Sequence, residues 1–439
     1  MYKRQIYNTM IDRETIVEII RDYQEMDLPD LIKRNIDIPL DLRIKRAISI
    51  IGPRRAGKTY TMFQLMKILL ERGVGRDRML YINFEDYRLE GINYIDLKKI
   101  VEIYYEMYPE NSRLKVWFFL DEIQNVGEWE KVVRNIMDRW NIQIFLSGSS
   151  SKLLSREIAT QLRGRTLTYI VYPFSFKEFL RARNFRIEKY MSSYEKNRLL
   201  NLLNEYLVYG GYPEAVIERE RRMKILREIW DVTIARDIID RWRIRNIRAL
   251  KLLIRALRKS REFSIHKFYR YLKSLGLRIS KNTLYNYIEY LNDSLILYLL
   301  KKYSPSYKNI EMSIPKIFFV DNGLYMAEES ISKLMENLVF MELRRRNYVE
   351  NEKLFYWKNS FGREVDFIVI DGELIQVCYE LTYENKDREI KSLIKASKQL
   401  NYKKLRILTW NQEDTININN RKIEITPLWK WLINKNQHI

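Results

Sequence analysis

Hydrophobic and polar positions between residues 46 and 172 follow two alternating patterns. Short apolar runs, beginning with residues 47–51, are typical of buried strands, and each is followed by a stretch whose apolar residues recur every three or four positions, as on one face of a helix. We expect further strands at 79–84, 116–120, 143–146 and 167–171, and helices around 62–70, 94–107 and 129–140. This alternation predicts an α/β fold with a doubly wound parallel sheet and helices on both of its faces.

The pattern changes after Pro173. Residues 174–300 carry the helical period almost throughout, with Gly210-Gly211-Tyr212-Pro213 as the one strong break, and strands and helices mix again from about residue 316. We therefore divide the chain into a helical leader at 1–45, an α/β core at 46–172, a helical region at 173–244, a basic region at 245–315 and a mixed α/β region at 316–439.

Composition narrows the class of protein. The 439 residues are 46% hydrophobic and 13% aromatic, too many for a disordered chain, and a single Cys rules out a disulfide-stapled domain. With one Cys and two His, zinc sites built from Cys and His are excluded, so any metal would be held by carboxylates, hydroxyls and phosphates. No apolar run reaches the roughly 18 residues that cross a bilayer, and no apolar signal core follows the N-terminus. We expect a cytoplasmic protein with no membrane partner.

Positive charge is concentrated in one part of the chain. The sequence has 78 Lys and Arg against 57 Asp and Glu, a net charge of +21, and residues 241–310 alone hold 17 Lys and Arg against 3 Asp and Glu, a net charge of +14. This concentration favours a polyanionic partner, DNA in the first place. A solvated basic surface is the alternative.

A glycine-rich segment lies between the first predicted strand and the first predicted helix. Its backbone N–H groups would point at the β- and γ-phosphates of a nucleotide, Lys58 would neutralise phosphate charge, and the Thr59 hydroxyl would bind Mg²⁺. We therefore predict ATP and Mg²⁺ as cofactors, rather than a glycine-containing turn with a surface lysine. The segment, which fits G-x-x-x-x-G-K-[ST], is Gly52-Pro53-Arg54-Arg55-Ala56-Gly57-Lys58-Thr59, and Tyr60 directly after it is included in the binding set.

A pair of acidic residues follows the apolar strand at 116–120. Asp121 would hold Mg²⁺ through water, and Glu122 would orient and deprotonate the attacking water. Asn83, at the end of the preceding strand, would hydrogen-bond Glu122 and hold it back until a ligand arrives; a turn or helix-cap asparagine is the commoner explanation. The pair, coming one strand after a phosphate loop, points to hydrolysis rather than to simple binding.

Two further groups are candidates for contact with the γ-phosphate. Ser147, at the end of the strand at 143–146, is our first choice for a sensing hydroxyl, and Ser149 is the second. Arg163 and Arg165 flank Gly164, and an arginine delivered into a neighbouring subunit would stabilise the transferring phosphoryl group. An exposed basic loop is the alternative for these two arginines.

Taken together, six motifs resemble a prokaryotic, chiefly archaeal, family of AAA-type ATPases with a C-terminal domain of unknown function. The resemblance covers nearly the whole chain. Besides the phosphate loop, the motifs are Tyr81-Ile82-Asn83-Phe84-Glu85-Asp86, Leu120-Asp121-Glu122-Ile123-Gln124, Ser147-Gly148-Ser149-Ser150, Leu162-Arg163-Gly164-Arg165 and Tyr209-Gly210-Gly211-Tyr212-Pro213-Glu214.

This resemblance implies an AAA+-like core with a helical lid at 173–244, a winged-helix domain at 245–315 and a restriction-endonuclease-like α/β domain at 316–439. The resemblance implies that Lys58, Thr59, Asp121 and Glu122 bind the nucleotide and the metal and activate water. The same resemblance also implies roles for Ser147 and for Arg163 or Arg165, although their match to the family is weaker. An arginine acting in trans implies a homo-oligomer, a hexameric ring by resemblance.

The basic region fits the winged-helix expectation. Helices are predicted at 264–275 and 280–292 with a turn at Gly276, followed by a strand-like run at 294–300. In such a module the second helix enters the major groove and the wing touches phosphates. A lid or a protein-docking surface is the alternative. The residues that would contact DNA are Lys281, Asn282, Tyr285 and Asn286 on the helix, with Lys301 and Lys302 at the tip of the wing.

The last region resembles a nuclease fold that lacks part of its chemistry. Glu336 and Glu342 lie on a helical run, and Asp366 lies on a predicted strand in the D…[DE]-x-K layout of metal-dependent nucleases. Gln376 and Cys378 occupy the places of the second carboxylate and the lysine, so that metal binding and water activation both suffer. We expect no phosphodiester cleavage, although Glu380, further along, is a possible substitute carboxylate.

The sequence therefore predicts an ATPase that couples hydrolysis to DNA binding and remodelling. The alternative is a nucleotide-controlled signalling or defence switch that acts through protein partners, and a third, weaker one is a nuclease regulated by ATP. Stimulation of ATP turnover by DNA separates the first two.

Overall fold

The computed structural model describes residues 11–148, 160–326, 329–418 and 421–434. The chain forms two compact units, Met1–Val171 and Tyr172–Ile439. The sequence divides the chain at four points, after residues 45, 172, 244 and 315. Of these, the structure has a boundary only next to residue 172, and the other divisions stay predictions.

A five-stranded parallel sheet forms the centre of the first unit. The strands lie in the order β2-β3-β4-β1-β5, so β1 lies between two strands that come later in the chain. This confirms the predicted doubly wound α/β core, and all residues of the central strands β1 and β3 are buried, as expected for a sheet covered on both faces. The strands are β1 (Ala47–Ile51), β2 (Met79–Asn83), β3 (Val116–Asp121), β4 (Ile142–Ser147) and β5 (Thr166–Ile170).

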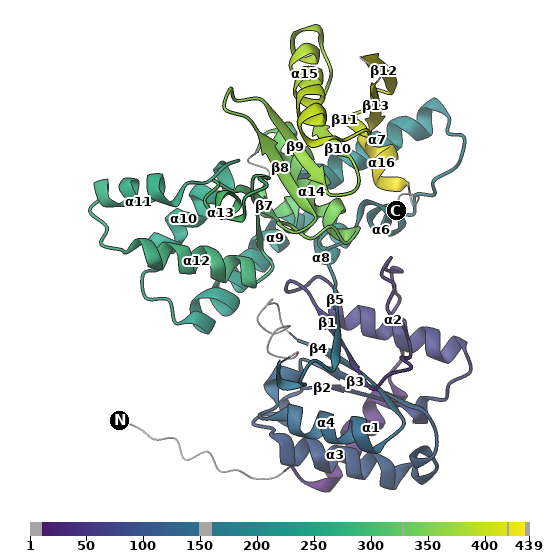
Figure 1. Ribbon diagram of the computed structural model, residues 1–439. Coiled ribbons are helices and arrows are strands. Elements are labelled where there is room, and N and C mark those ends of the chain that lie inside the picture. The colour runs from purple at the N-terminus through teal and green to yellow at the C-terminus, as the bar shows by residue number, and fades with distance from the viewer. Residues whose placement is uncertain (1–10, 149–159, 327–328, 419–420, 435–439) are drawn as a thin grey trace. The chain divides into compact units, whose positions relative to one another are not determined.

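Helices cover both faces of this sheet (Figure 1). The helices α1 (Arg13–Glu25), α3 (Tyr94–Met107) and α4 (Trp129–Arg139) pack together on one face, and α2 (Lys58–Glu71) covers the other. Residues 11–45 belong to this unit, because the isoleucines of α1 are buried with α3 and α4, while the segment after α1 packs beside α2. Residues 11–45 therefore pack against the sheet and helices of the first unit.

The second unit begins with helices. The predicted helices at 264–275 and 280–292 are present as α11 and α12, each one residue shorter at its N-terminal end. The strand β6 (Leu297–Leu300) pairs antiparallel with β7 (Lys316–Phe319), and α13 (Tyr307–Glu311) lies in the chain between them. The helices are α6 (Phe176–Ala182), α7 (Ser193–Tyr209), α8 (Pro213–Ile217), α9 (Arg222–Val232) with a π-helical continuation (Thr233–Asp240), α10 (Ile247–Lys259), α11 (Ile265–Ser274) and α12 (Lys281–Asp293).

A mixed six-stranded sheet completes the second unit, in the order β12-β13-β11-β10-β9-β8. The helices of this part are α14 (Ile331–Arg345), α15 (Tyr383–Leu400) and α16 (Leu428–Ile433). In the parts of the chain that the structure describes, no helix has the length and apolar character needed to cross a bilayer. The strands are β8 (Leu354–Lys358), β9 (Glu364–Val369), β10 (Leu374–Val377), β11 (Leu405–Thr409), β12 (Asp414–Ile418) and β13 (Arg421–Pro427).

The double glycine at 210–211 lies in contact with the buried carboxylate of Asp321. The Asp321 carboxylate accepts the backbone N–H of Gly211 at 2.7 Å and that of Gly323 at 2.8 Å. Burial raises the pKa of Asp321 to about 6, although these two N–H groups act in the opposite direction. Gly210 has a φ of 72°, and a Cβ there would lie 1.7 Å from Asp321 Oδ1. The glycine break in the helical region is therefore a close contact with the segment after β7.

Gly210 has a φ of 72° and a ψ of −161°, a backbone region that essentially only glycine adopts. We expect Gly210→Ala to lower the free energy of unfolding by more than the cost of this backbone strain, roughly 1–3 kcal/mol, because its Cβ would also overlap Asp321. Gly276→Ala is the matched control, since Gly276 has the same φ of 72° and a Cβ there would meet nothing within 4 Å. Urea unfolding of both variants measures the difference. Equal losses would show that the contact with Asp321 carries no steric constraint.

Candidate functional site

The glycine-rich segment forms the loop between β1 and α2. Gly57 precedes α2 with a φ of 97° and a ψ of 34°, a left-handed conformation that favours glycine at this turn. Pro53 and Ala56 are buried, whereas Arg55 and Tyr60 are exposed. The predicted binding segment at 52–60 thus has an apolar inner side, and residues 58–60 already belong to the first turn of α2.

Lys58 and Arg34 both reach the backbone of this loop. The buried Lys58 ammonium donates to the carbonyl oxygens of Gly52 at 3.2 Å and Pro53 at 3.4 Å. The guanidinium of Arg34, a buried arginine from the segment before β1, donates to the carbonyl oxygen of Ala56 at 2.8 Å. Sequence reasoning missed Arg34, because an arginine 18 residues before the loop carries no local signal.

Asp121 is the point at which four segments meet. Its Oδ2 accepts the hydroxyl of Thr59 at 2.7 Å and that of Tyr81 at 3.0 Å, and its Oδ1 accepts the hydroxyl of Ser147. A threonine hydroxyl beside a carboxylate is an oxygen pair of the kind that Mg²⁺ prefers. The two predicted metal ligands, Thr59 and Asp121, are therefore brought together and fit a magnesium ion bound with a nucleotide. Tyr81 lies within a motif of the sequence but was not predicted to take part.

Glu122 lies at the end of β3 in a left-handed conformation, with a φ of 54°. Its backbone N–H donates to Ser147 Oγ at 3.0 Å, and its carboxylate accepts Gln124 Nε2 at 2.6 Å. Burial raises the pKa of Glu122, while the Lys58 ammonium and the Gln124 amide act in the opposite direction. The carboxylate is thus held in place by a neighbour two residues along the chain.

Asn83 differs from expectation. Asn83 is paired with Asp121 in the register of β2 and β3, but its Oδ1 accepts the backbone N–H of Glu85 at 3.0 Å, a local turn contact typical of asparagine. Asn83 therefore makes the local contact of a turn asparagine, which was the commoner explanation. Among the described residues, Gln124 is the residue whose amide binds the Glu122 carboxylate.

The remaining candidates for contact with the γ-phosphate differ in burial and in their neighbours. Ser147 is buried beside Asp121 and Glu122 at the end of β4, and Ser149 lies outside the described residues. Arg163 and Arg165 are exposed, and Arg165 forms an ion pair of 2.6 Å with Asp138 near the end of α4. Neither arginine contacts the loop at 52–59 among the described residues of its own unit, which leaves a role in a neighbouring subunit as a prediction.

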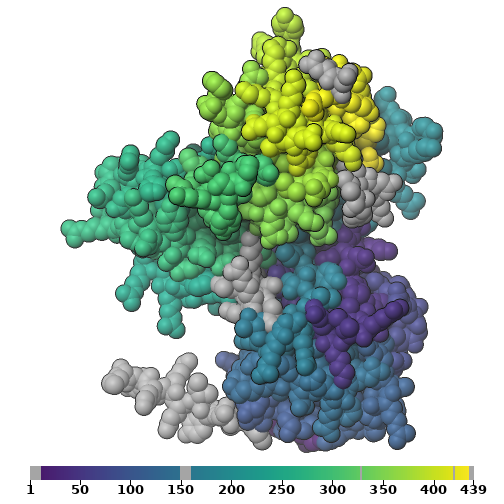
Figure 2. All heavy atoms as spheres, viewed as in Figure 1, coloured from purple at the N-terminus to yellow at the C-terminus, as the bar shows by residue number. Residues whose placement is uncertain are grey.

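In the second unit, α12 carries the predicted DNA-binding residues on one side. Leu284, Tyr287, Ile288 and Leu291 are buried on its inner face. Figure 2 shows the long side chains of this teal-to-green part of the chain at the molecular surface. The Lys281 ammonium lies 5.4 Å from the centre of the Tyr269 ring, a contact that sequence reasoning did not anticipate. The exposed residues of α12 include all four that were predicted: Lys281, Asn282, Tyr285 and Asn286.

Lys301 and Lys302 do not form the tip of a wing. They follow β6 directly and are half-buried, while the connection to β7 continues through α13 to residue 315. The Lys301 ammonium is paired with Glu311 at 2.5 Å, and its backbone N–H donates to Asn351 at 2.7 Å. The expected tip was placed too early, because the apolar run that ends at residue 300 gave no sign of a long connection.

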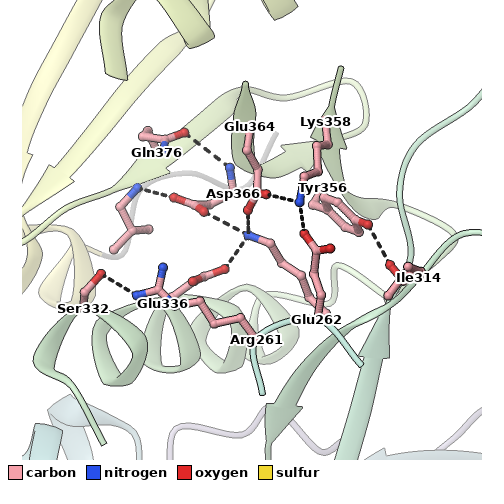
Figure 3. Close-up of polar contacts among 12 residues, drawn as sticks. Arg261, Glu262, Ile314, Ser332, Glu336, Tyr356, Lys358, Glu364, Asp366 and Gln376 are labelled. Carbon is pink, nitrogen blue, oxygen red and sulfur yellow. Dashed lines mark hydrogen bonds and ion pairs between the residues drawn. The ribbon is translucent and has the colours of Figure 1, made fainter. Parts of the chain in front are cut away.

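Nuclease-type residues in the C-terminal part are only partly assembled (Figure 3). Asp366 on β9 and Glu336 on α14 lie in one buried cluster, whereas Glu342 pairs with Arg346 at 3.1 Å. Gln376 on β10 donates to Glu389 at 2.7 Å, and burial raises the pKa of the Cys378 thiol to about 12. Glu380 is exposed beyond the end of β10. The second carboxylate and the lysine of the nuclease layout are therefore not supplied by β10.

Comparisons with known proteins show which families and chains this one is similar to. Residues 44–180 match the model of an AAA domain, and residues 200–334 and 332–431 match two domains of unknown function, DUF8612 and DUF4143. An uncharacterized protein of Methanocaldococcus jannaschii is 41% identical over 97% of this chain and 96% of its own length. One of Haemophilus influenzae is 31% identical over 88% of this chain and 93% of its own length. Among solved structures, a Walker-type ATPase of Pyrococcus abyssi aligns with a TM-score of 0.43 at 16% identity, covering 64% of this chain and 90% of that one.

Replacing Ser147 by alanine tests whether its hydroxyl holds the acidic pair. Ser147→Ala removes the acceptor of the Glu122 N–H and a donor to Asp121, and we expect it to lower the free energy of unfolding by about 1–3 kcal/mol. Ser49→Ala on β1 is the control, because Ser49 is equally buried and its hydroxyl has no hydrogen-bond partner among the described residues. We expect Ser49→Ala to be neutral or slightly stabilising. Chemical denaturation measures the free energy of unfolding of the two variants. Equal losses would contradict the role of the Ser147 hydroxyl in holding Asp121 and Glu122.

Proposed function

The chain belongs to the family of AAA-domain P-loop ATPases that carry a C-terminal DUF4143 domain, and on that premise we propose that it binds ATP and hydrolyses it at the site formed by Lys58, Thr59, Asp121 and Glu122. The observation that carries this proposal is the 2.7 Å contact between the Thr59 hydroxyl and the Asp121 carboxylate, with Glu122 next in the chain. These groups come from the end of β3, from the phosphate loop and from the first turn of α2.

Each residue has a role that follows from its contacts. Lys58, which lies against the carbonyls of the loop, would turn its ammonium to the phosphates of a bound nucleotide. Thr59 and Asp121 would hold Mg²⁺, which supplies neutralisation of phosphate charge. Glu122 would accept a proton from the attacking water once Gln124 releases its carboxylate. Ser147 keeps the backbone of Glu122 fixed relative to Asp121.

Two substitutions separate binding from hydrolysis. We expect Glu122→Gln to retain ATP and to lower kcat by roughly 10²–10⁴, the usual contribution of a general base. Lys58→Ala should lose nucleotide affinity as well, because the positive charge beside the phosphates is gone. Phosphate release and equilibrium binding of a fluorescent ATP analogue are the two measurements.

Glu128→Gln, an exposed glutamate of the same unit, serves as the control and should behave as the parent does. Unchanged phosphate release in Glu122→Gln would exclude Glu122 as the base. Unchanged binding and release in Lys58→Ala would exclude ATP hydrolysis at this loop altogether.

We further propose that the ATPase acts as a homo-oligomer, a hexameric ring in the simplest case. The exposed position of Arg163 and Arg165 supports this, because an arginine that completes a neighbouring site has to be accessible. Arg165 would exchange its surface ion pair with Asp138 for the phosphates, at little cost, since exposed ion pairs contribute only about 0–1 kcal/mol.

The basic region is proposed to bind DNA as a winged helix, so that hydrolysis drives DNA remodelling. The order α10, α11, α12, then antiparallel β6 and β7 supports a winged helix, and the four exposed residues of α12 support a recognition surface. The net charge of +14 at 241–310 supplies attraction for the phosphates. Lys301 would contribute less to DNA affinity than the exposed residues of α12, because its ammonium is paired with Glu311.

DNA binding should depend steeply on salt, because each phosphate contact adds about 0.9 to the slope of log affinity against log salt. Lys281→Ala should reduce that slope by about 1. Lys398→Ala, an exposed lysine on α15 outside the basic region, should leave it unchanged. Fluorescence anisotropy of a labelled duplex between low and high salt measures both. A flat salt dependence in the parent would remove DNA from the proposal.

A nucleotide-controlled switch that acts through protein partners is the second candidate. The bond between Gln124 and the Glu122 carboxylate favours it, because it restrains the base and would keep turnover slow. Several-fold stimulation of ATP turnover by single-stranded, duplex or branched DNA supports the remodelling function. Indifference to all three, with tightly retained nucleotide, supports the switch.

A further inference from the structure

A buried lysine lies at the centre of the nuclease-like carboxylate cluster. Lys316, the first residue of β7, has a side chain that is only 2% exposed. Its Nζ lies 2.6 Å from Glu336 on α14, 2.6 Å from Glu364 and 3.0 Å from Asp366, both on β9. Figure 3 shows the Glu336 carboxylate on the helix and the Glu364 and Asp366 carboxylates on the strand pointing into one common cluster, and the Lys316 ammonium contacts all three. The lysine thus enters the cluster from outside the nuclease-type sheet.

The hydrogen-bonding capacity of this ammonium is fully used. A lysine has three N–H donors, and each of the three carboxylates accepts at a distance short enough for one of them. Burial disfavours the charge, but the three carboxylates outweigh it and raise the pKa of Lys316 well above its ordinary value. Lys316 is therefore a permanent cation in this cluster.

The carboxylates that surround Lys316 are those that a divalent ion would use. Glu336 lies on α14 and Asp366 on β9, the strand that the sequence predicted to carry a nuclease-type aspartate, and carboxylate oxygens are the preferred ligands of Mg²⁺ and Mn²⁺. Within the described residues, however, no group of three or more His, Cys, Asp and Glu is arranged to hold a metal ion. The carboxylates are spread around the ammonium instead.

The cavity next to Lys316 and Glu336 is too small for a hydrated ion, and neither Glu364 nor Asp366 lines it. This cavity, lined by Arg261, Lys316, Tyr325, Lys333 and Glu336 among others, has a volume of about 10 Å³, the lower limit for one water. A metal-dependent nuclease needs room for the ion and for the attacking water. The second oxygen of Asp366 is also occupied, because it accepts the backbone N–H of Val377 at 2.9 Å.

We propose that Lys316 occupies the cation position of this carboxylate cluster in place of a divalent metal ion, so that the chain keeps a nuclease-like centre permanently closed to metal. Its ion pairs connect β7 to α14 and β9. Because β7 directly follows the basic region, the end of that region is connected to them as well. A neighbouring lysine, Lys358, pairs with Glu262 and Glu364 at the edge of the same cluster and extends this connection. The proposal does not depend on ATP hydrolysis.

The test is Mn²⁺ binding by the full chain without nucleotide, measured as the loss of the free Mn²⁺ signal in electron paramagnetic resonance. We expect Lys316→Ala to gain one site with a dissociation constant of about 0.1–1 mM, as in weak carboxylate sites, at least tenfold tighter than any binding by the parent at this cluster. The site should disappear in the double variant Lys316→Ala with Asp366→Asn, which leaves Thr59 and Asp121 intact.

Lys358→Ala is the matched control, because it removes a lysine from the edge of the cluster and not from its centre. We expect this variant to gain no Mn²⁺ site. A gain equal to that of Lys316→Ala would show a general effect of lost positive charge and would overturn the proposal.

Folding of the variants provides the second measurement. If Lys316→Ala unfolds at lower temperature, millimolar Mn²⁺ should restore part of the lost stability, because the ion takes the place of the ammonium. A folded Lys316→Ala that gains no site, or an unstable one that Mn²⁺ does not stabilise, overturns the proposal. So does Mn²⁺ binding by the parent that Asp366→Asn abolishes, since Lys316 would then stand beside a metal as a catalytic group.

Discussion

The contact between the Thr59 hydroxyl and the Asp121 carboxylate is the constraint on which the first unit depends. It joins the start of α2 to the end of β3, and these meet because parallel strands deliver their carboxyl ends to one edge of the sheet. Tyr81 and Ser147 add hydrogen bonds from the strands on either side of β3. A buried carboxylate needs such partners, since an unpaired one would be costly to bury. These partners fix the position of the Asp121 carboxylate at the end of β3.

Lysines and buried carboxylates have different partners in the two units. In the first unit the acidic pair faces a loop that can admit a phosphate chain, and its lysine lies against backbone carbonyls that a ligand can replace. In the second unit the buried carboxylates have a lysine of the chain itself at their centre. A cation supplied by the chain is not exchanged, whereas a metal ion is. Similar residue types therefore have different partners in the two units: Lys58 contacts backbone carbonyls, and Lys316 contacts carboxylates.

Much of the fold could be predicted from local pattern. The five core strands, the helices between them and the helices of the basic region lie within a few residues of their predicted positions, because their apolar periodicity depends on neighbouring residues alone. The place of the glycine-rich segment between β1 and α2, and of Asp121 and Glu122 at the end of β3, was predictable for a related reason, since the spacing of the motif and its place between a strand and a helix are both local. The length of the connection between β6 and β7 was not predictable, because no apolar period marks it.

Sequence by itself determined the groups available to this chain: a glycine-rich loop with the pattern G-x-x-x-x-G-K-[ST], an acidic pair, a basic region and a set of C-terminal carboxylates. Tertiary structure decided which of several chemically equivalent groups became partners. Gln124 and not Asn83 holds Glu122, and Lys316 fills a cluster whose members are 20 to 50 residues away. A lysine or an amide has the same local preferences in either position, and its partners are set by burial and by the approach of segments far apart in the chain. Only the folded chain contains that information.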